Sequence, residues 1–208
     1  MNLLENFINE CDIALKTLSF KKSGTGRLYP ANEAPSSLSK EEKNLSAQLM
    51  RVNLAGEVAA QALYRGQAMV CKDAEIKNHL VQAGEEETDH LIWCKKRLEG
   101  LNGKPSILNP VWYAGSFAIG AIFGSFGEKT SLGFVEETEK QVVKHLERHL
   151  DKVSKNDTET IEILKTMRAD EDEHAQEAIE NGSESLSEPT KKVMSFTAKV
   201  MTSSSAYI

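Results

Sequence analysis

The chain has 208 residues, with 25 Lys and Arg against 31 Asp and Glu, which gives a formal net charge of −6. Hydrophobic residues make up 40% and charged residues 27%, a composition that excludes a disordered chain and a protein with several membrane spans. The length predicts one domain, residues 1–208, with its own hydrophobic core. The acidic balance argues against nucleic-acid binding, because such proteins need a basic surface to neutralise phosphates.

Cysteine usage and the first residues both favour the cytosol. Cys11, Cys71 and Cys94 have no zinc or redox spacing, which predicts reduced thiols. The first 20 residues contain acidic side chains and no arginine. We therefore expect neither a secretory signal nor a mitochondrial transit peptide.

The apolar residues recur with helical spacing along nearly the whole chain, which predicts an all-α fold. Residues 3–20 form an amphipathic helix, and the glycines and prolines of 22–37 predict a connector, so 1–38 is expected as an N-terminal helix and linker. Ser39 and Glu42 have the spacing of a capping box that begins a long helix ending near residue 70.

The remaining helices are expected to follow closely upon one another. They are separated by turn signals, and Asp73 is a suitable cap for the first of them. Their ranges are 73–99, 105–127, 131–153, 156–181 and, as an amphipathic C-terminal helix, 186–208. We expect residues 39–182 to form a four-helix bundle in which 105–127 is an apolar crossover helix.

Two Glu-x-x-His motifs lie on separate predicted helices, one from Glu87 to His90 and the other from Glu171 to His174. Residues three apart share a helix face, so each motif can direct a carboxylate and an imidazole at the same point. One such motif alone is a weak signal, because glutamate is common on helix surfaces.

A lone glutamate precedes each motif at a matched distance. Glu57 stands 30 residues before Glu87, and Glu139 stands 32 residues before Glu171. Both midpoints fall in predicted turns, so each lone glutamate should face its motif across a helical hairpin at the same height. The two sets repeat after 82 and 84 residues, which indicates an internal duplication of a helix pair.

Two such hairpins packed together would bring four glutamates and two histidines to one level, the ligand set of ferritin-like di-iron carboxylate bundles. Four carboxylates balance two Fe(II) ions, and oxygen and imidazole ligands suit iron or manganese better than a structural zinc. The predicted metal ligands are Glu57, Glu87, His90, Glu139, Glu171 and His174. His145 and Asp170 are candidates for supporting these ligands from outside, and the glutamates at 85, 86, 136, 137, 173 and 177 are interpreted as solvated surface charges.

Residues 105–127 contain no charge and are long enough to span a bilayer. A single span would place the two halves of the metal site on opposite sides of the membrane. We therefore interpret the segment as a crossover helix that exposes an apolar face to lipid or to a hydrophobic substrate. Gly120 and Gly124 form a helix-contact pattern within it. The basic and apolar sides of 186–208 suit an acidic membrane surface, with packing on the bundle as the alternative.

Four segments of the chain are distinctive in combination: RVNLAGEVAAQALYRGQ, EEETDH, LNPVWYAGSFAIGA and ADEDEH. Together they resemble the demethoxyubiquinone hydroxylase family of ubiquinone biosynthesis, within a similarity that extends from about Leu49 to Gly182. The family commonly has Asp-His where this chain has Asn53-Leu54, neither of which is a predicted ligand.

The resemblance implies a di-iron monooxygenase that uses O₂ to hydroxylate the ring of a polyprenylated methoxy-benzoquinol. It also implies peripheral attachment to the cytoplasmic face of a bacterial inner membrane, as a homo-oligomer or in a biosynthetic assembly. In this hypothesis Glu57 and Glu139 are terminal ligands, and Glu87 and Glu171 bridge the two irons.

Three other functions use a similar ligand set. A rubrerythrin-like peroxidase normally adds four cysteine ligands, and a manganese catalase would not need the apolar segment. An iron-storage protein usually lacks the second complete Glu-x-x-His motif. The chain has no glycine-rich nucleotide loop, so electrons are expected from a partner, from the quinol or from a weakly bound donor.

Overall fold

The computed structural model describes residues 3–32 and 38–208, and within these ranges the regular structure is helical, which confirms the all-α prediction. Residues 33–37 of the expected connector lie outside the described part. The helices are α1 (Leu3–Leu18), α2 (Lys40–Val70), α3 (Ala74–Gly100), α4 (Asn109–Ser125), α5 (Glu128–Lys152), α6 (Thr158–Glu180) and α7 (Glu188–Ser205).

Local capping explains where the bundle helices begin. The Ser39 hydroxyl accepts from the Glu42 amide at 3.2 Å, and the Glu42 carboxylate accepts from the Ser39 amide at 2.7 Å, so the predicted capping box is present. Asp73 caps α3 as expected. Helix α6 begins at Thr158, two residues after the predicted start at 156, because the Asp157 carboxylate accepts from the Thr160 amide and caps the helix there. The predicted start of α5 at 131 was three residues late: α5 begins at Glu128, directly after a glycine with φ of 104°.

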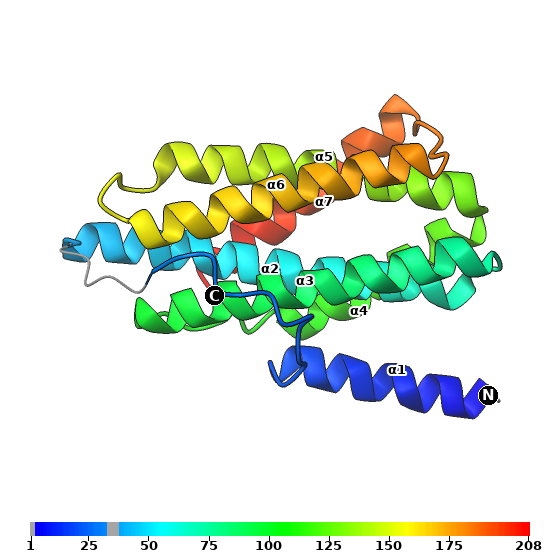
Figure 1. Ribbon diagram of the computed structural model, residues 1–208, viewed down its shortest axis with the longest axis horizontal. Coiled ribbons are helices and arrows are strands. Elements are labelled where there is room, and N and C mark those ends of the chain that lie inside the picture. The colour runs from blue at the N-terminus through cyan, green and yellow to red at the C-terminus, as the bar shows by residue number, and fades with distance from the viewer. Residues whose placement is uncertain (1–2, 33–37) are drawn as a thin grey trace.

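Two helical hairpins, α2–α3 and α5–α6, lie against each other along the length of the molecule (Figure 1). Their short turns at 71–73 and 153–157 contain the midpoints predicted from the glutamate spacing. One hydrophobic cluster joins all four helices, and its fully buried members include Met50, Leu54, Leu91, Leu98, Leu146 and Ile163. This shared core holds the two hairpins in register.

Helix α4 returns along α2 and connects the end of one hairpin to the start of the other, as the crossover prediction required. Glycines allow the two backbones to approach closely: a Cβ on Gly120 would lie 2.2 Å from the Leu63 carbonyl oxygen, and one on Gly66 would lie 2.1 Å from that of Phe117. The opposite side of the charge-free segment exposes apolar side chains, namely Ile107, Val111, Ile122 and Phe126. Among the described residues, no helix combines the length and hydropathy needed to cross a bilayer.

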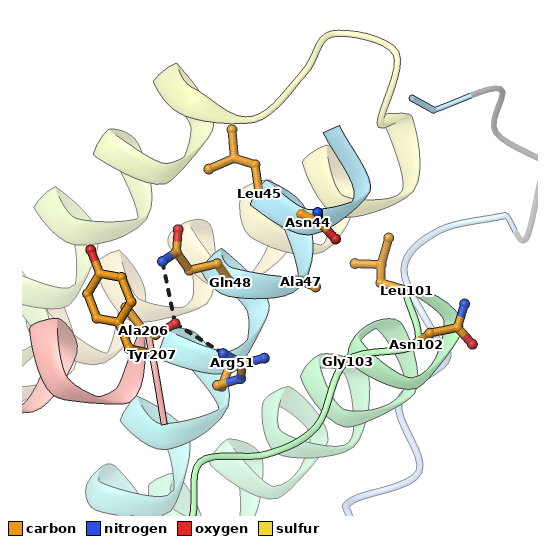
Figure 2. A pocket seen from close by; sticks show the side chains of 10 residues that line it. All are labelled: Asn44, Leu45, Ala47, Gln48, Arg51, Leu101, Asn102, Gly103, Ala206 and Tyr207. Atoms are coloured by element: carbon orange, nitrogen blue, oxygen red, sulfur yellow. Dashed lines mark hydrogen bonds between the residues drawn. The ribbon is translucent and has the colours of Figure 1, made fainter. Parts of the chain in front are cut away.

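The end of α7 is fixed to the bundle at the rim of an open pocket (Figure 2). The Ala206 carbonyl oxygen accepts from Gln48 Nε2 at 3.4 Å and from Arg51 Nη1 at 3.0 Å. Arg51 also donates to the Lys104 carbonyl at 2.8 Å, which ties α7 to the connection before α4. The pocket lining includes none of the predicted metal ligands. Further along α7 the apolar side chains face outward, with Val193, Phe196 and Val200 exposed.

Candidate metal centre

The six predicted ligands come from the four bundle helices and are all buried, with exposed fractions between 0% and 4%. Helix α2 contributes Glu57 and α5 contributes Glu139, and the two motifs stand on α3 and α6. Ionisable side chains are seldom buried this completely without a partner or a metal.

Both histidines direct the same ring atom at the two motif glutamates. His90 Nδ1 lies 3.0 Å from Glu87 Oε2 and 3.2 Å from Glu171 Oε1. His174 Nδ1 lies 3.3 Å from Glu87 Oε1 and 3.4 Å from Glu171 Oε2. Each of these two glutamates therefore turns one carboxylate oxygen toward each histidine.

The lone glutamates lie at opposite sides of this group. Glu57 Oε2 is 3.8 Å from His90 Nδ1, and one ligand atom each from Glu57, Glu87, His90 and Glu171 lie within 4.8 Å of one another. Glu139 interacts electrostatically with Glu171, Glu87 and His174, and its Oε1 accepts from the Tyr64 hydroxyl at 2.6 Å. The structure thus brings all six predicted side chains together.

A carboxylate stands behind each histidine, at its outer nitrogen. His90 Nε2 donates to Asp170 Oδ2 at 2.8 Å, and His174 Nε2 donates to Glu86 Oε2 at 2.9 Å. An acceptor at Nε2 fixes a proton there and turns Nδ1 toward the other carboxylates, so Nδ1 is the atom that a metal ion would bind once it displaces a proton from it.

The interpretation of Glu86 as a solvated charge was wrong, because its carboxylate is part-buried against His174. A sequence signal for it existed. Glu86 and Asp170 are 84 residues apart, the same offset that relates His90 to His174. The acidic residue directly before each motif therefore accepts a hydrogen bond from the histidine of the other motif.

His145 lies elsewhere on α5. Its ring stacks against His149 with centroids 4.0 Å apart, and among the described contacts it touches none of the six predicted ligands. Burial lowers the pKa of His145 to about 4 and that of His149 to about 2, so both rings are neutral at pH 7.

Burial raises the pKa of Glu57 and of Glu139 well above the ordinary carboxyl value, and neighbouring carboxylates raise both further. Burial opposes a charge on His90, but the charge of Glu87 and the other acidic neighbours raise the pKa of the imidazole well above its usual range. The group therefore retains protons at neutral pH, and divalent cations that bind there would displace them.

Three buried atoms of the group have no hydrogen-bond partner within the described part of the chain: Glu87 Oε1, Glu171 Oε2 and His174 Nδ1. Buried polar atoms rarely stay unsatisfied unless a water or an ion occupies the space between them. An oxygen-rich donor set with two imidazoles fits iron or manganese, so the residues present fit a di-iron centre.

Residues 44–205 match the family model described as "Ubiquinone biosynthesis protein COQ7". The chain belongs to this family. This confirms the resemblance found in the sequence, and the matched region includes all six predicted ligands.

Curated relatives cover the full chain. A protein of Legionella pneumophila named 3-demethoxyubiquinol 3-hydroxylase is 49% identical over 100% of this chain and 98% of its own length. Proteins with the same name from Nitrosococcus oceani and Francisella philomiragia are each 46% identical, over 100% and 97% of this chain and 98% and 96% of their own lengths.

A solved dodecameric thioferritin from Bacteroides fragilis has a similar fold. It matches with a TM-score of 0.55 over 67% of this chain and 84% of that chain, at 22% sequence identity. At this identity the likeness shows the fold alone, and that fold is ferritin-like, as the ligand pattern predicted.

Proposed function

We propose that the chain is a di-iron monooxygenase that hydroxylates the ring of a demethoxyubiquinol with O₂, in the biosynthesis of ubiquinone. The observation that carries the proposal is the arrangement of Glu87 and Glu171, each of which turns one carboxylate oxygen toward His90 and the other toward His174. The names of relatives that are 46–49% identical over nearly the whole chain supply the substrate and favour this activity over peroxide handling or iron storage.

The proposed ligand roles follow from these positions. Glu87 and Glu171 would be shared by the two ions, each histidine would hold one ion through Nδ1, and Glu57 and Glu139 would each serve one ion as a terminal ligand. Two ferrous ions bound there would supply the electrons and the site at which O₂ is activated. Four carboxylates offset the four positive charges, so the buried centre is neutral as a whole.

The protein's own side chains orient the ligands and exclude water. Asp170 and Glu86 fix the two imidazole rings at their outer nitrogens, and the Tyr64 hydroxyl fixes Glu139. Close packing of the surrounding apolar core keeps the space dry, which strengthens each of these contacts.

We further propose that 1–208 acts as a single domain attached to the cytoplasmic face of the bacterial inner membrane. A polyprenyl substrate resides in lipid, and the exposed apolar side chains of 105–127 and α7 offer a surface that can enter it. Lys192 and Lys199 are exposed on α7 and would interact with anionic headgroups.

The metal centre is tested by comparing Glu171→Ala with Glu173→Ala. Glu173 is a matched control because it lies two residues further along the same helix and is exposed. The protein is loaded anaerobically with Fe(II) and bound iron is counted. A short-chain demethoxyubiquinol and O₂ are then added, and the hydroxylated product is measured by chromatography. We expect two irons and hydroxylation in the native protein and in Glu173→Ala. We expect neither full loading nor product in Glu171→Ala, and unimpaired hydroxylation by that variant would refute the proposal.

Membrane attachment is tested separately by flotation with vesicles that contain anionic lipid. Phe196→Ser removes a large exposed apolar side chain from α7 and should reduce the floated fraction. Activity on a water-soluble short-chain quinol should be unchanged, since Phe196 lies outside the metal centre. Equal floated fractions for the native protein and Phe196→Ser would argue against α7 as a membrane anchor.

A further inference from the structure

The described residues that follow α1 run back across the bundle (Figure 1). We name residues 22–31 the arm. Four of its side chains form hydrogen bonds or ion pairs with carboxylates on α3 and α6: Lys22 with Glu85, Thr25 with Asp89, Arg27 with Asp170 and Tyr29 with Glu159. The arm is thus attached to the two helices that carry the Glu-x-x-His motifs.

Two glycines shape the arm for this docking. A Cβ on Gly24 would lie 2.0 Å from Asp89 Oδ1, so only glycine lets the backbone approach that carboxylate. Gly26 has a φ of 93°, which side chains other than glycine rarely adopt. Between them, the Thr25 amide donates to Asp89 Oδ2 at 3.2 Å, and the next residue after the turn is Arg27.

Arg27 binds the Asp170 carboxylate through two guanidinium nitrogens. Nη1 lies 2.7 Å from Oδ2, and Nη2 donates to Oδ1 at 3.0 Å. The guanidinium also stacks over Trp93, with its carbon 5.0 Å from the ring centroid, and the Trp93 ring lies 5.3 Å from the ring of His90. Because Asp170 Oδ2 accepts from His90 Nε2, Arg27 holds both side chains that touch this imidazole from outside.

The outer carboxylate of the other half, Glu86, has no bidentate arginine partner in the described part of the chain, although the charge of Arg27 also acts on it at longer range. Glu86, the counterpart of Asp170, accepts from the neutral amide of Gln82 at 3.2 Å in addition to His174. The duplicated helix pairs therefore support their histidines unequally, since one outer carboxylate is held by a bidentate arginine and the other by an amide.

We propose that Arg27 is a positioning residue for the metal ion bound by His90, acting through Asp170, so that the two metal positions have different affinities. The proposal rests on the di-metal centre of the proposed function. Partners behind a ligating histidine fix its ring orientation, and their removal typically lowers metal affinity about 10–100-fold. With Arg27 removed, Asp170 is free to rotate toward solvent and the His90 ring loses its fixed orientation.

The test is a titration of the metal-free protein with Co²⁺ under anaerobic conditions, followed by the visible absorption of each bound ion. Arg27→Gln should weaken one of the two binding steps about tenfold and alter the absorption of that ion only. The matched control is Arg168→Gln, which makes the same charge change on α6 at an exposed pair with Glu147. This control should titrate like the native protein.

A double-mutant cycle separates positioning from a general effect of the arm. If Arg27 acts through Asp170, Arg27→Gln should have no further effect on Co²⁺ affinity in an Asp170→Asn background. Arg27→Lys should restore part of the affinity, and Tyr29→Phe, which loosens the arm at Glu159, should leave both binding steps unchanged.

Three results would overturn the proposal: native-like Co²⁺ binding by Arg27→Gln, multiplicative effects of the Arg27 and Asp170 substitutions, or a loss of helical circular dichroism in Arg27→Gln. A native protein and an Arg168→Gln control that both fail to bind a second Co²⁺ would refute the di-metal centre itself. That outcome is distinguishable, because it does not depend on Arg27.

Discussion

The close contact between α2 and α4 predicts opposite effects for two glycine substitutions in the same helix. In Gly120→Ala the new Cβ would lie 2.2 Å from the Leu63 carbonyl oxygen and 3.0 Å from the carbonyl carbon. An ordinary contact needs more than 3 Å, so the helices must separate by about 1 Å, and such overpacking typically costs about 1–3 kcal/mol. Alanine's better helix propensity offsets about 0.5–1 kcal/mol of this cost, so the free energy of unfolding should fall by about 1 kcal/mol at the middle of these ranges.

Gly115→Ala is the matched control, because a Cβ there meets nothing within 4 Å. With no clash to offset the gain in propensity, its free energy of unfolding should rise by about 0.5–1 kcal/mol. Urea unfolding of the two variants and the native protein, followed by circular dichroism, measures both changes. If Gly120→Ala were as stable as Gly115→Ala, backbone contact with α2 would not be what requires glycine in α4.

Three further predictions concern buried polar groups. Tyr64→Phe removes the hydrogen bond to Glu139 and should weaken one Co²⁺ binding step about tenfold. The ion affected should be the one at the other metal position from the ion that Arg27 affects. Unchanged affinity would show that Glu139 needs no hydrogen-bond donor. Arg97→Met leaves the fully buried Asp157 without its cation and should lower the free energy of unfolding by about 3–5 kcal/mol in urea titrations, so a loss below about 1 kcal/mol would contradict this. Burial lowers the pKa of His149 to about 2, so between pH 6.5 and 2 the unfolded chain takes up a proton that the folded chain does not. The contribution of His149 to the free energy of unfolding should therefore fall as the pH falls from 7 to 4. Relative to the native protein, His149→Leu should lose less stability over that range in the same urea assay; equal slopes would mean that His149 titrates alike in both states.

The predicted ligands could be found from the sequence because their positions obey helix geometry. Residues three apart share a face, and residues equidistant from a hairpin turn share a height. These two rules are local, and they selected Glu57 and Glu139 from a glutamate-rich chain before any packing was known. The capping box that begins α2 and the Asp73 cap that begins α3 are local in the same sense.

Glu86 and Tyr64 were missed for a common reason. Both point at ligands on the other hairpin, and periodicity within one helix carries no information about that partner. Glu86 had a detectable signal in the repeat offset of 84 residues, whereas Tyr64 had none, because the equivalent position in the second helix pair, Leu146, is apolar.

The sequence by itself determined the helical class, the boundaries of most helices, the duplicated hairpins and the six side chains that meet between them, because short-range spacing decides each of these. Tertiary packing alone decided which carboxylate stands behind which histidine, that α4 lies on α2, and that Arg27 reaches Asp170. Arg27 and Asp170 are 143 residues apart, and a contact of that kind depends on how the arm returns across the bundle, which no local pattern specifies.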